Sequence, residues 1–502
     1  EEPKIKTSLS IAQQLNKGPY FARCLREWEK LVKNGETIPI SKREKHCKIK
    51  SLLDDEDVQM QIATYLHENK FEFYVADFVD YVKNVVFPSL GIEQEITIST
   101  RMTRNWLNKM GFEFKQFKKG VYVDGHERPD VIAYRSKFLE QMASYEKLMP
   151  KFEDDNLEIQ INPNLQENEH LHILVTHDET TFHSNDGRQS GWASHGEQPL
   201  RKKGKERSIH VSDFLCETIG RLQLSEEQKL SEVANNIPYE ARVIMNPETN
   251  YDGWWNVELL VQQVVDCAIP IFEATHPGAV AVFAFDNFTS HGAFSSDALI
   301  ASHMNVGPGG KQPKMRNTIF NGNVQFMNFP DNHPEESLRG KQKGMKQILY
   351  ERQLLTPGLK GFCKNKETID NQCCMQHILE NQPDFLAQKC MIQEIIESKG
   401  HKVIFYPKFH CELNYIEMYW SATKRYSRNN CNYTWNGLQQ VVPVALDHVS
   451  LLEIKAFARK SFRYMDAYRK ELNVKQAEYA VKKYKRHRVI PNNILQDILT
   501  KF

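Results

Sequence analysis

HLHILVTHD (His170–Asp178) is the stretch that decides the fold class, because its apolar run ends in an acidic residue. An apolar run of this length predicts a buried strand. AVAVFAFD (Ala279–Asp286) repeats the pattern, and HKVIFYP (His401–Pro407) predicts another strand. Strands that alternate with helical patterns predict an α/β domain in the centre of the chain. Further strands are expected at 207–215 and 241–246, and helices at 131–147, 254–274 and 411–428.

Upstream of this domain, apolar residues at helical spacing predict three short helices between residues 54 and 112. The last, ISTRMTRNWLNKMGF (Ile98–Phe112), starts at the Ser99 cap signal and ends at Gly111. Three such helices suit a helix-turn-helix domain, although similar triads occur in proteins that never bind DNA. The basic stretch that follows would form a wing or linker along phosphates. The candidate DNA-binding residues are Arg101, Arg104, Lys109, Lys115, Lys118 and Lys119.

The composition is that of a folded globular protein, with 40% hydrophobic and 26% charged residues. A chain of 502 residues predicts two to four domains. No apolar run approaches the roughly 18 to 20 residues that span a bilayer, and no apolar signal-peptide core is present, so we expect neither a membrane nor a secretory protein. Ten Cys without regular spacing indicate reduced thiols rather than a disulfide framework.

The net charge of +1 hides an asymmetry along the chain. Residues 1–50 carry 12 basic and 6 acidic residues, residues 451–502 carry 13 and 5, and the middle 400 therefore carry a net charge of −13. Basic ends around an acidic middle fit a polyanion held by the termini and a carboxylate-dependent site between them. Solvated, mobile tails would produce the same distribution.

These patterns divide the chain into seven segments. They are a basic N-terminal arm with a short helix (1–50), a helix-turn-helix domain (51–125), a linker helix (126–165), the two parts of the α/β domain (166–300 and 397–450), an insertion between those parts (301–396), and a basic helical C-terminal region (451–502). The short helix of the arm is expected at Ile11–Val32. The fold class predicted is multidomain α/β, with an all-α N-terminal region.

Three sequence blocks place acids where a strand meets a helix or loop: THDETTF (Thr176–Phe182), FDNFTSH (Phe285–His291) and ELNYIEMYW (Glu412–Trp420). Acids at the carboxyl ends of buried strands project into the crevice where α/β sheets bind ligands. Buried carboxylates without Lys or Arg partners need cations to neutralise them, and their oxygens suit Mg²⁺ or Mn²⁺. Two such ions about 3.5–4 Å apart support phosphodiester chemistry. Each acid taken alone would equally fit a helix cap or a loop.

The same blocks resemble the D-E-S/T-x-F, D-N-x-x-x-H and D-L-N-P-I-E-x-x-W blocks of mariner-like transposases, which belong to the DDE superfamily and have an RNase H-like fold. The resemblance to fungal DDE-type transposases of this group extends to 118–135, 381–389, 406–414 and 461–469, and so covers most of the chain. Carried over residue by residue, it implies catalytic, metal-binding acids at Asp178, Asp286 and Glu417. Asn287, His291 and Asn414 match positions that support those acids, and Glu412 matches an acid that is not catalytic.

The resemblance implies a cut-and-paste DNA transposase that binds the terminal inverted repeats of its element and target DNA. In the family mechanism two Mg²⁺ ions, for which Mn²⁺ can substitute, activate water for cleavage and then the freed 3′-hydroxyl for strand transfer. No covalent protein intermediate forms, which agrees with the absence of a convincing Ser-His-Asp or Cys-His arrangement. The resemblance also implies a homodimer that works in the nucleus and inserts at TA dinucleotides.

The sequence departs from the family pattern in two places. Tyr415 replaces the usual Pro after Asn414, which we expect to loosen the turn from strand to helix. The gap from Asp286 to Glu417 is 131 residues, against a few dozen in the family, so the insertion must loop out of the fold. Glu412 and Glu417 lie five residues apart, about 140° around a helix, so only one can face the metals. We expect Glu417 to do so while Glu412 caps the helix.

The insertion carries two further signals. Cys363, Cys373, Cys374 and His377 form a C-x9-C-C-x2-H pattern that would suit a structural Zn²⁺, but the pattern lacks a C-x2-C knuckle and buried thiols explain it more simply. The Gly-Pro-rich basic stretch at 304–316 predicts a flexible strap facing DNA. We expect the insertion to pack beside the crevice without contributing metal ligands.

Two other functions fit the same residues. A domesticated sequence-specific DNA-binding protein would keep the fold without transposing, and an RNase H-like endonuclease of another kind would keep the acids. All three acids are present, which weighs against decay of the site. A helix-turn-helix would be unexpected in the second alternative.

Overall fold

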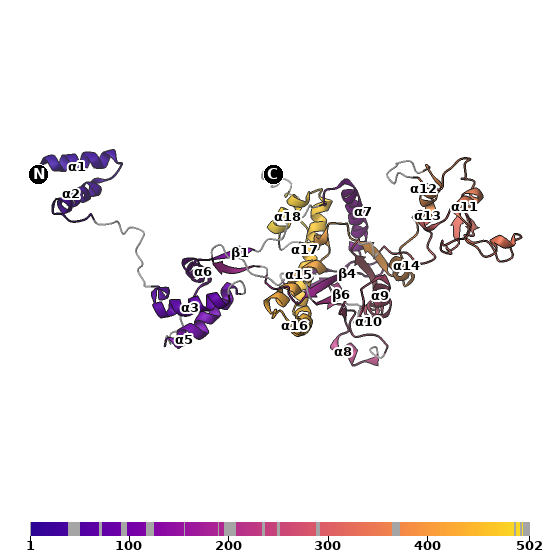
Figure 1. Cartoon of the computed structure of the whole chain (residues 1–502), viewed down its shortest axis with the longest axis horizontal. Helices are drawn as coiled ribbons and strands as arrows, with labels where there is room; N and C mark the ends of the chain where they lie inside the picture. Colours follow the sequence, from indigo (N-terminus) through magenta and orange to yellow (C-terminus); the bar gives the residue numbers. More distant parts are fainter. Residues whose placement is uncertain are drawn as a thin grey trace. The chain divides into compact units, whose positions relative to one another are not determined.

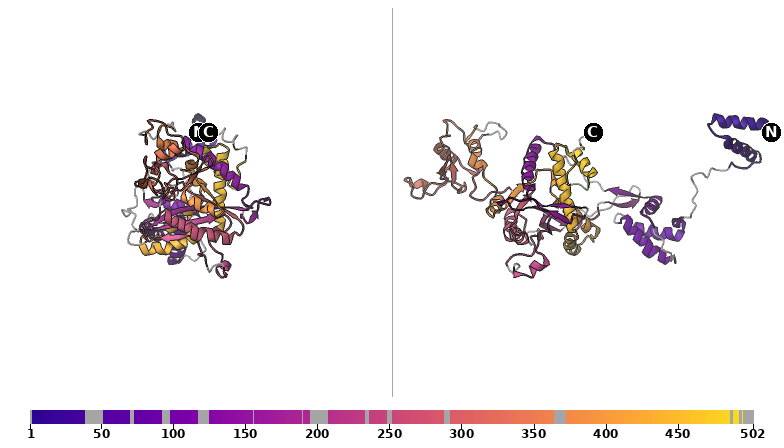
Figure 2. Two further views of the ribbon diagram at one scale, coloured as in Figure 1. Left: turned by 90° about the vertical axis from the view of Figure 1, so that its right-hand side faces the viewer. Right: turned by 180° about the vertical axis from the view of Figure 1, so that it is seen from behind.

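The computed structural model describes residues 2–38, 51–69, 73–91, 98–116, 125–154, 156–188, 190–194, 207–232, 236–247, 252–287, 292–363, 372–485, 488–491 and 494. The chain divides into two compact units, one made of Glu1–Lys115 with Gly191–Gln198 and one of Gln116–Ser190 with Pro199–Phe502 (Figure 1, Figure 2). Lys118, Lys119 and His291 lie outside the described residues, as does the side chain of Lys115. Among the described helices, none combines the length and the apolar content needed to cross a membrane.

The first unit begins with two helices where the sequence predicted one. Helix α1 (Glu2–Gln14) and helix α2 (Pro19–Lys33) pack together, and the Arg26 guanidinium donates to the Ser8 hydroxyl at 2.5 Å. The break follows from Asn16, whose φ of 52° is left-handed, and from Pro19, the first residue of α2. Proline lacks the amide hydrogen that a continuous helix would use, so it starts a helix instead.

The three predicted helices of residues 54–112 are confirmed. They are α3 (Glu56–Glu68), α4 (Val75–Tyr81) with its continuation through the π turn η2 (Val82–Val86) into α5 (Phe87–Ser89), and α6 (Thr100–Lys109). The Ser99 hydroxyl caps α6 by accepting from the Met102 amide at 3.2 Å. Trp106 and Leu107 are buried in the shared core, whereas Arg101, Arg104 and Lys109 are exposed. Strand β1 (Phe112–Gln116) follows and pairs with β5 (Ser190–Ser194).

The second unit is built on one mixed sheet. Its strand order is β12 (Lys402–Phe405), β9 (Val280–Phe285), β4 (His172–His183), β6 (Ser208–Cys216) and β7 (Gly220–Arg221), and β8 (Val243–Met245) also pairs with β6. Strands β12, β9 and β4 run parallel, and β6 runs antiparallel to β4. This order, with a long antiparallel pair next to parallel strands joined by crossovers, is that of an RNase H-like fold. The predicted fold class is therefore confirmed.

Alternation along the strands gives the sheet two apolar faces. Leu174, Val282 and Ala284 face one core, and Val175 and Phe283 face the other. The helices that contribute to the first core are α7 (Pro129–Glu146), α15 (Ile416–Asn429), α16 (Trp435–Asp447), α17 (Leu451–Arg469) and α18 (Val474–Lys483). The other face is covered by α9 (Val257–Gln263), the π turn η4 (Val264–Ala268), α10 (Ile269–Thr275) and α14 (Met391–Ser398).

Three helices that the sequence analysis placed outside the α/β domain pack against its sheet. Helix α7, expected to be a linker, buries Phe138 and Met142 in the first core. Helix α14, expected to lie in the insertion, buries Ile392 and Ile396 against the sheet as part of the β9-to-β12 crossover. Helix α17, expected to belong to a separate basic helical C-terminal region, buries one whole side in the first core. Each has an apolar stripe that only the sheet can cover.

The insertion has a separate core of its own, centred on residues such as Met345, Ile348 and Leu379. Its elements are the hairpin β10 (Thr318–Phe320) and β11 (Asn323–Gln325), with α11 (Met345–Glu351), α12 (Met375–Glu380) and α13 (Pro383–Leu386). The stretch 304–316 is built into this core, because Met304 and Met315 are buried, so the prediction of a flexible strap is wrong. The remaining elements of the unit are the hairpin β2 (Lys151–Glu153) and β3 (Ile159–Ile161), and α8 (Glu226–Lys229).

Candidate active site

Strand register places two of the predicted acids side by side. Thr176 of β4 is paired with Ala284 of β9 in a parallel ladder, so Asp178 and Asp286, each two residues further on, occupy equivalent positions. Even-numbered side chains of both strands face the core that contains α15, and the two carboxylates therefore lie on that side of the sheet. Because both apolar runs end in an acid and pair in this register, the two acids lie next to each other.

Helix α15 brings the third acid to the same place. Glu417, Trp420 and Lys424 follow one another at spacings of three and four residues, so they share one helix face. The Trp420 indole donates a hydrogen bond of 3.0 Å to Oδ2 of Asp178. The Lys424 ammonium lies 5.9 Å from the centre of the Phe182 ring at the end of β4. This helix face is therefore directed at Asp178, which lies in the middle of β4, and at the end of that strand.

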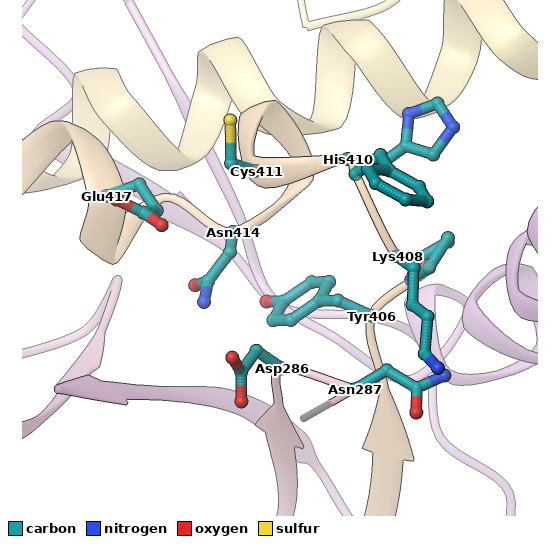
Figure 3. Close-up of a pocket in the computed structure, with 10 residues that line it drawn as sticks. Asp286, Asn287, Tyr406, Lys408, His410, Cys411, Asn414 and Glu417 are labelled. Atoms are coloured by element: carbon teal, nitrogen blue, oxygen red, sulfur yellow. The ribbon is translucent and has the colours of Figure 1, made fainter. Parts of the chain in front are cut away.

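A pocket of about 540 Å³ opens between these elements. Figure 3 shows the carboxylates of Asp286 and Glu417 and the Asn414 amide directed toward the same space. Asp178 is only 8% exposed and is not itself one of the residues that line the pocket. The pocket is lined by Asp286, Asn287, Tyr406, Pro407, Lys408, Phe409, His410, Cys411, Asn414 and Glu417. In the part of the chain that the structure describes, no residue of the insertion belongs to this lining.

The surroundings of Asp178 and Glu417 disfavour the ionised form of both carboxyl groups. Burial raises the pKa of Asp178 well above its ordinary value, and the charges of Glu417, Glu179 and Asp286 raise it further. Glu417 is exposed toward the pocket but surrounded by protein elsewhere, and desolvation raises its pKa despite the nearby Lys424. Such a cluster gains stability when a cation enters it, because the cation offsets both desolvation and mutual repulsion.

Asp213 on β6 shows what a buried structural acid looks like in the same sheet. It is 1% exposed, and the Arg242 guanidinium lies 2.9 Å from its Oδ2 atom. Among the described residues, no Lys or Arg forms such an ion pair with Asp178, whose hydrogen-bond partner is the neutral indole of Trp420. Asp178 therefore lacks, among the described residues, the basic partner that a buried structural acid has, and its donor atoms would suit a bound cation.

Asn414 fixes the segment that carries Glu417. Its Oδ1 atom accepts a short hydrogen bond from the Thr176 hydroxyl, and its amide donates to the His177 carbonyl at 3.4 Å. The Tyr406 hydroxyl donates to the same Thr176 oxygen at 3.2 Å. Both Asn414 and Asn287 line the pocket, which places two of the three predicted supporting residues beside the acids.

Tyr415 does not loosen the turn, contrary to the prediction. Its ring is fully buried in the core, and its hydroxyl donates to the Leu215 carbonyl at 2.9 Å. The residue immediately precedes α15, so this hydrogen bond anchors the start of the helix to β6. A buried phenol held by a backbone carbonyl provides here the rigidity that a proline would supply through its ring.

Glu412 does not cap α15, contrary to the prediction. It lies in the turn η7 (Cys411–Leu413) and points away from the pocket. Its Oε1 atom accepts from Nδ1 of His410 at 2.7 Å and from the Tyr468 hydroxyl at 2.7 Å, and Nε2 of His126 lies 3.6 Å from Oε2. Arg135 can only donate to Nε2 of His410, at 3.3 Å, so the His410 proton is on Nδ1 and faces Glu412. His126, His410 and Glu412 could also hold a metal ion by their spacing, but these protein contacts already account for them.

His177 also has a structural role. It is fully buried on the opposite face of β4 from Asp178, packed 4.5 Å from the Phe214 ring, and its Nε2 lies 2.8 Å from the Ser212 hydroxyl. It therefore does not face the pocket.

Sequence reasoning missed several residues of the site. Trp420, Tyr406, Thr176 and Lys424 all contact or surround the acids. The signal for Trp420 and Lys424 was present, because both lie at helical spacing from Glu417. Tyr406 and Thr176 had no such signal, because only the folded sheet brings the end of β12 next to β4.

The donor set fits divalent cations that prefer oxygen. Asp178, Asp286 and Glu417 are the residues that would hold them, because their carboxylates come from three elements to one side of the sheet and burial raises the pKa of Asp178 and of Glu417. Carboxylate oxygens are the ligands that Mg²⁺ and Mn²⁺ prefer. Within the described residues, two sets of potential ligands have their donor atoms within 4.8 Å of one another, namely His126 with His410 and Glu412, and Cys363 with Cys373, Cys374 and His377 in the insertion. The three acids are spaced more widely than either of these sets.

Fold and site together define an RNase H-like protein with an acidic pocket at the carboxyl ends of its parallel strands. No protein-family model and no curated protein matches the chain. Among solved structures, it is similar to the Mos1 transposase paired-end complex with left transposon end (TM-score 0.35, 10% identity, 95% of this chain and 97% of that chain covered) and to a pre-cleavage Mos1 transpososome (TM-score 0.35, 11% identity, 93% and 96% covered). It is also similar to the Mos1 mariner paired end complex with Mn (TM-score 0.34, 10% identity, 91% and 94% covered). At these TM-scores, the fold assignment rests on the strand order and not on the likeness.

Proposed function

We propose that this chain is a DDE-type DNA transposase that cleaves DNA at the ends of its element and joins those ends to target DNA. The observation that carries the proposal is the convergence of Asp178, Asp286 and Glu417, the three acids that match the family blocks, from β4, β9 and α15. A structural role for three mutually repelling carboxylates would require basic partners, and Asp178 has an indole instead.

Mg²⁺ or Mn²⁺ bound to these acids would supply a Lewis acid and an activated oxygen nucleophile for phosphodiester chemistry. The chain's own residues position the reactants. Trp420 orients the Asp178 carboxylate, and Asn414 holds the start of α15 against β4 so that Glu417 stays over the pocket. Lys408 and Asn287 line the pocket wall and offer donors to DNA phosphates. No protein nucleophile is needed.

Recognition of the terminal inverted repeats is assigned in this proposal to the first unit. Arg101, Arg104 and Lys109 are exposed on α6, opposite its buried Trp106 and Leu107. An exposed basic helix face on a three-helix core is the arrangement by which helix-turn-helix domains read the major groove. By the family resemblance, the protein would act as a homodimer in the nucleus.

The experiment is a cleavage assay on labelled duplex DNA that carries the terminal repeats of the element. With Mg²⁺, the full chain is expected to nick at the repeat boundary, and Asp178→Asn or Asp286→Asn to bind the repeats without nicking. Binding without nicking by the unaltered chain would favour the domesticated DNA-binding alternative. Nicking without any preference for the repeats would favour another RNase H-like endonuclease.

A further inference from the structure

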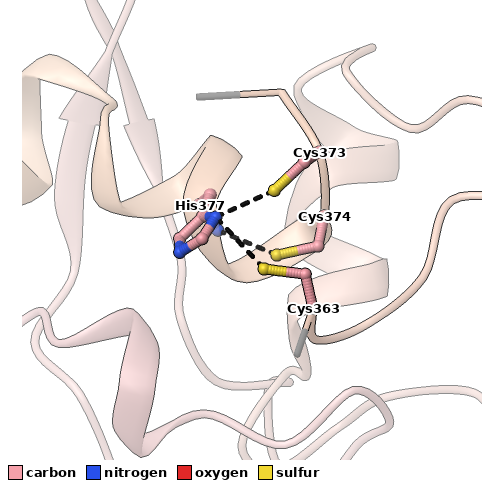
Figure 4. Close-up of side chains that lie close together, drawn as sticks. All are labelled: Cys363, Cys373, Cys374 and His377. Carbon is pink, nitrogen blue, oxygen red and sulfur yellow. Dashed lines mark hydrogen bonds between the residues drawn. The ribbon is translucent and has the colours of Figure 1, made fainter. Parts of the chain in front are cut away.

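A second cluster of metal-binding side chains lies in the insertion. Four potential ligand atoms lie within 4.8 Å of one another: the Sγ atoms of Cys363, Cys373 and Cys374 and a ring nitrogen of His377. Figure 4 shows the three sulfur atoms directed at His377, two at its ring and that of Cys374 at its backbone amide, and all three cysteines precede α12 in the chain. No disulfide links any cysteine that the structure describes.

The distances fit a tetrahedral ion. Zn–S bonds of about 2.3 Å and Zn–N bonds of about 2.0–2.1 Å imply tetrahedral edges of about 3.6 Å between sulfur and nitrogen and about 3.8 Å between sulfurs. Cys363 Sγ lies 3.6 Å from His377 Nδ1, which equals such an edge, and Cys373 Sγ lies 2.9 Å from the same atom. Cys373 would therefore have to move outward by about 0.7 Å to reach the same edge length, and the other separations lie within the 4.8 Å limit of the cluster.

Backbone contacts bring the ligands together. The Met375 amide donates to the Lys360 carbonyl at 2.9 Å, and the Gln376 amide donates to the Gly361 carbonyl at 3.2 Å. The segment that ends in Cys363 is thus held across the first turn of α12. Gly361 permits this path because a Cβ there would collide with the side chain of Val306. The Cys374 sulfur accepts from the His377 amide at 3.5 Å, a contact that an anionic sulfur strengthens.

The insertion has a reason to need such a link. Among the described residues, its separate core has eleven buried side chains, and five of them are the flexible Met304, Met315, Met327, Met345 and Met375. Its helices have at most seven residues and its strands three. A core this small needs a covalent or metal link to hold one structure. Met375 and Leu379 of α12 belong to that core, so an ion at the start of α12 would anchor it.

We propose that Cys363, Cys373, Cys374 and His377 bind one structural Zn²⁺ that stabilises the insertion. Thiolates with an imidazole in tetrahedral arrangement select Zn²⁺ over the oxygen-preferring Mg²⁺, so this site is distinct in chemistry from the acidic pocket. All four ligand positions are filled by side chains, which makes the ion structural and leaves none open for substrate. Buried thiols alone would not explain why all four donors converge on one point.

The test is the metal content of the full chain, purified without chelator in zinc-supplemented medium. One Zn²⁺ per chain is expected in the unaltered protein, and at most one tenth of that in Cys363→Ser and His377→Ala. Cys390→Ser is the matched control, because Cys390 lies nearby in sequence but packs in the sheet core at the N-cap of α14, where Ser is favourable. This variant should keep the full equivalent.

Replacement of the metal by Co²⁺ gives a second readout, which reports the ligand type and geometry in the unaltered chain itself. The unaltered chain and Cys390→Ser should show the intense visible absorption of tetrahedral cobalt with thiolate ligands, and Cys363→Ser should lose it. Less than one tenth of an equivalent of Zn²⁺ in the unaltered chain, zinc unchanged in both ligand variants, or a disulfide between any two of the cysteines would overturn the proposal. Neither readout involves DNA cleavage, so the transposase proposal stands or falls separately.

Discussion

Replacing Glu412 and Glu417 one at a time by Gln should change stability in opposite directions. Burial by itself would raise the pKa of Glu412. Hydrogen bonds from His126, His410 and Tyr468 stabilise the ionised carboxylate more strongly than burial destabilises it, and the pKa falls from 4.5 to about 2. Each pKa unit corresponds to about 1.4 kcal/mol, so ionised Glu412 stabilises the native protein by about 3 kcal/mol at pH 7. The amide oxygen of the Glu412→Gln variant would still accept from Tyr468, which leaves an expected loss of about 2–3 kcal/mol.

Glu417→Gln should instead stabilise the metal-free protein. Desolvation raises the pKa of Glu417, so its ionised form is less favourable in the native state than in the unfolded chain at pH 7. The neutral amide removes this unfavourable charge, and the same change should remove the stabilisation by Mg²⁺ that the unaltered chain shows. The two acids therefore separate a structural from a metal-binding role.

The assay is urea unfolding of the metal-free protein at pH 7, measured by hydrogen exchange of peptides that contain β12 and α17. Glu478→Gln is the matched control, since Glu478 forms an exposed i,i+4 pair with Lys482 worth about 0–1 kcal/mol. The Glu412 contribution is complete above about pH 4.5 and is lost as the pH falls toward 2, so the gap between Glu412→Gln and the unaltered chain should close in that window. A Glu412→Gln variant no less stable than Glu478→Gln, or a Glu417→Gln variant equally destabilised, would refute the reasoning.

Three further predictions concern other parts of the chain. Asp178→Asn should raise the metal-free stability, by an amount that grows as the pH rises from the ordinary pKa of an Asp to the elevated native pKa and stays constant above it, and should abolish DNA nicking; urea unfolding across pH and the cleavage assay measure both. Arg242→Leu should destabilise the second unit by about 3–5 kcal/mol because Asp213 stays buried without its cation, and combining it with Asp213→Leu should restore much of the loss in urea titrations. Arg101→Ala combined with Arg104→Ala should lower the magnitude of the slope of log affinity against log salt by about 1.8 if both contact phosphates, as measured by titration of terminal-repeat DNA.

The parts of this fold that were predictable are those that short-range patterns determine. The apolar runs that end in Asp178 and Asp286 specified two parallel strands and, through the period of two, the face on which their carboxylates lie. Helical spacing specified α6 and its buried Trp106. The choice of Asp178, Asp286 and Glu417 among the acids of the chain came from the family resemblance, whereas the local patterns predicted only that acids follow these apolar runs.

Other features depend on contacts that no local pattern reveals. The role of Glu412 is set by Tyr468, which lies 56 residues later on α17, and by His126 from the segment before α7. The charge of the C-terminal region predicts a basic helical segment that binds a polyanion or remains solvated, yet Arg488 binds Glu217 at 3.2 Å and lies 3.7 Å from the centre of the Phe462 ring. Charge composition gives the number of basic residues but not the partners that the fold assigns to them.

The most direct test of the central claim is titration of Mn²⁺ into the full chain by electron paramagnetic resonance, together with the single variants of the three acids. The unaltered chain and Glu412→Gln should bind Mn²⁺ with the same affinity, because Glu412 points away from the pocket. Asp178→Asn, Asp286→Asn and Glu417→Gln should each weaken binding at least about tenfold, the equivalent of about 1.4 kcal/mol for one lost ligand charge. Equal Mn²⁺ affinity in the unaltered chain and all three acid variants would contradict the assignment of this pocket as the metal-binding active site.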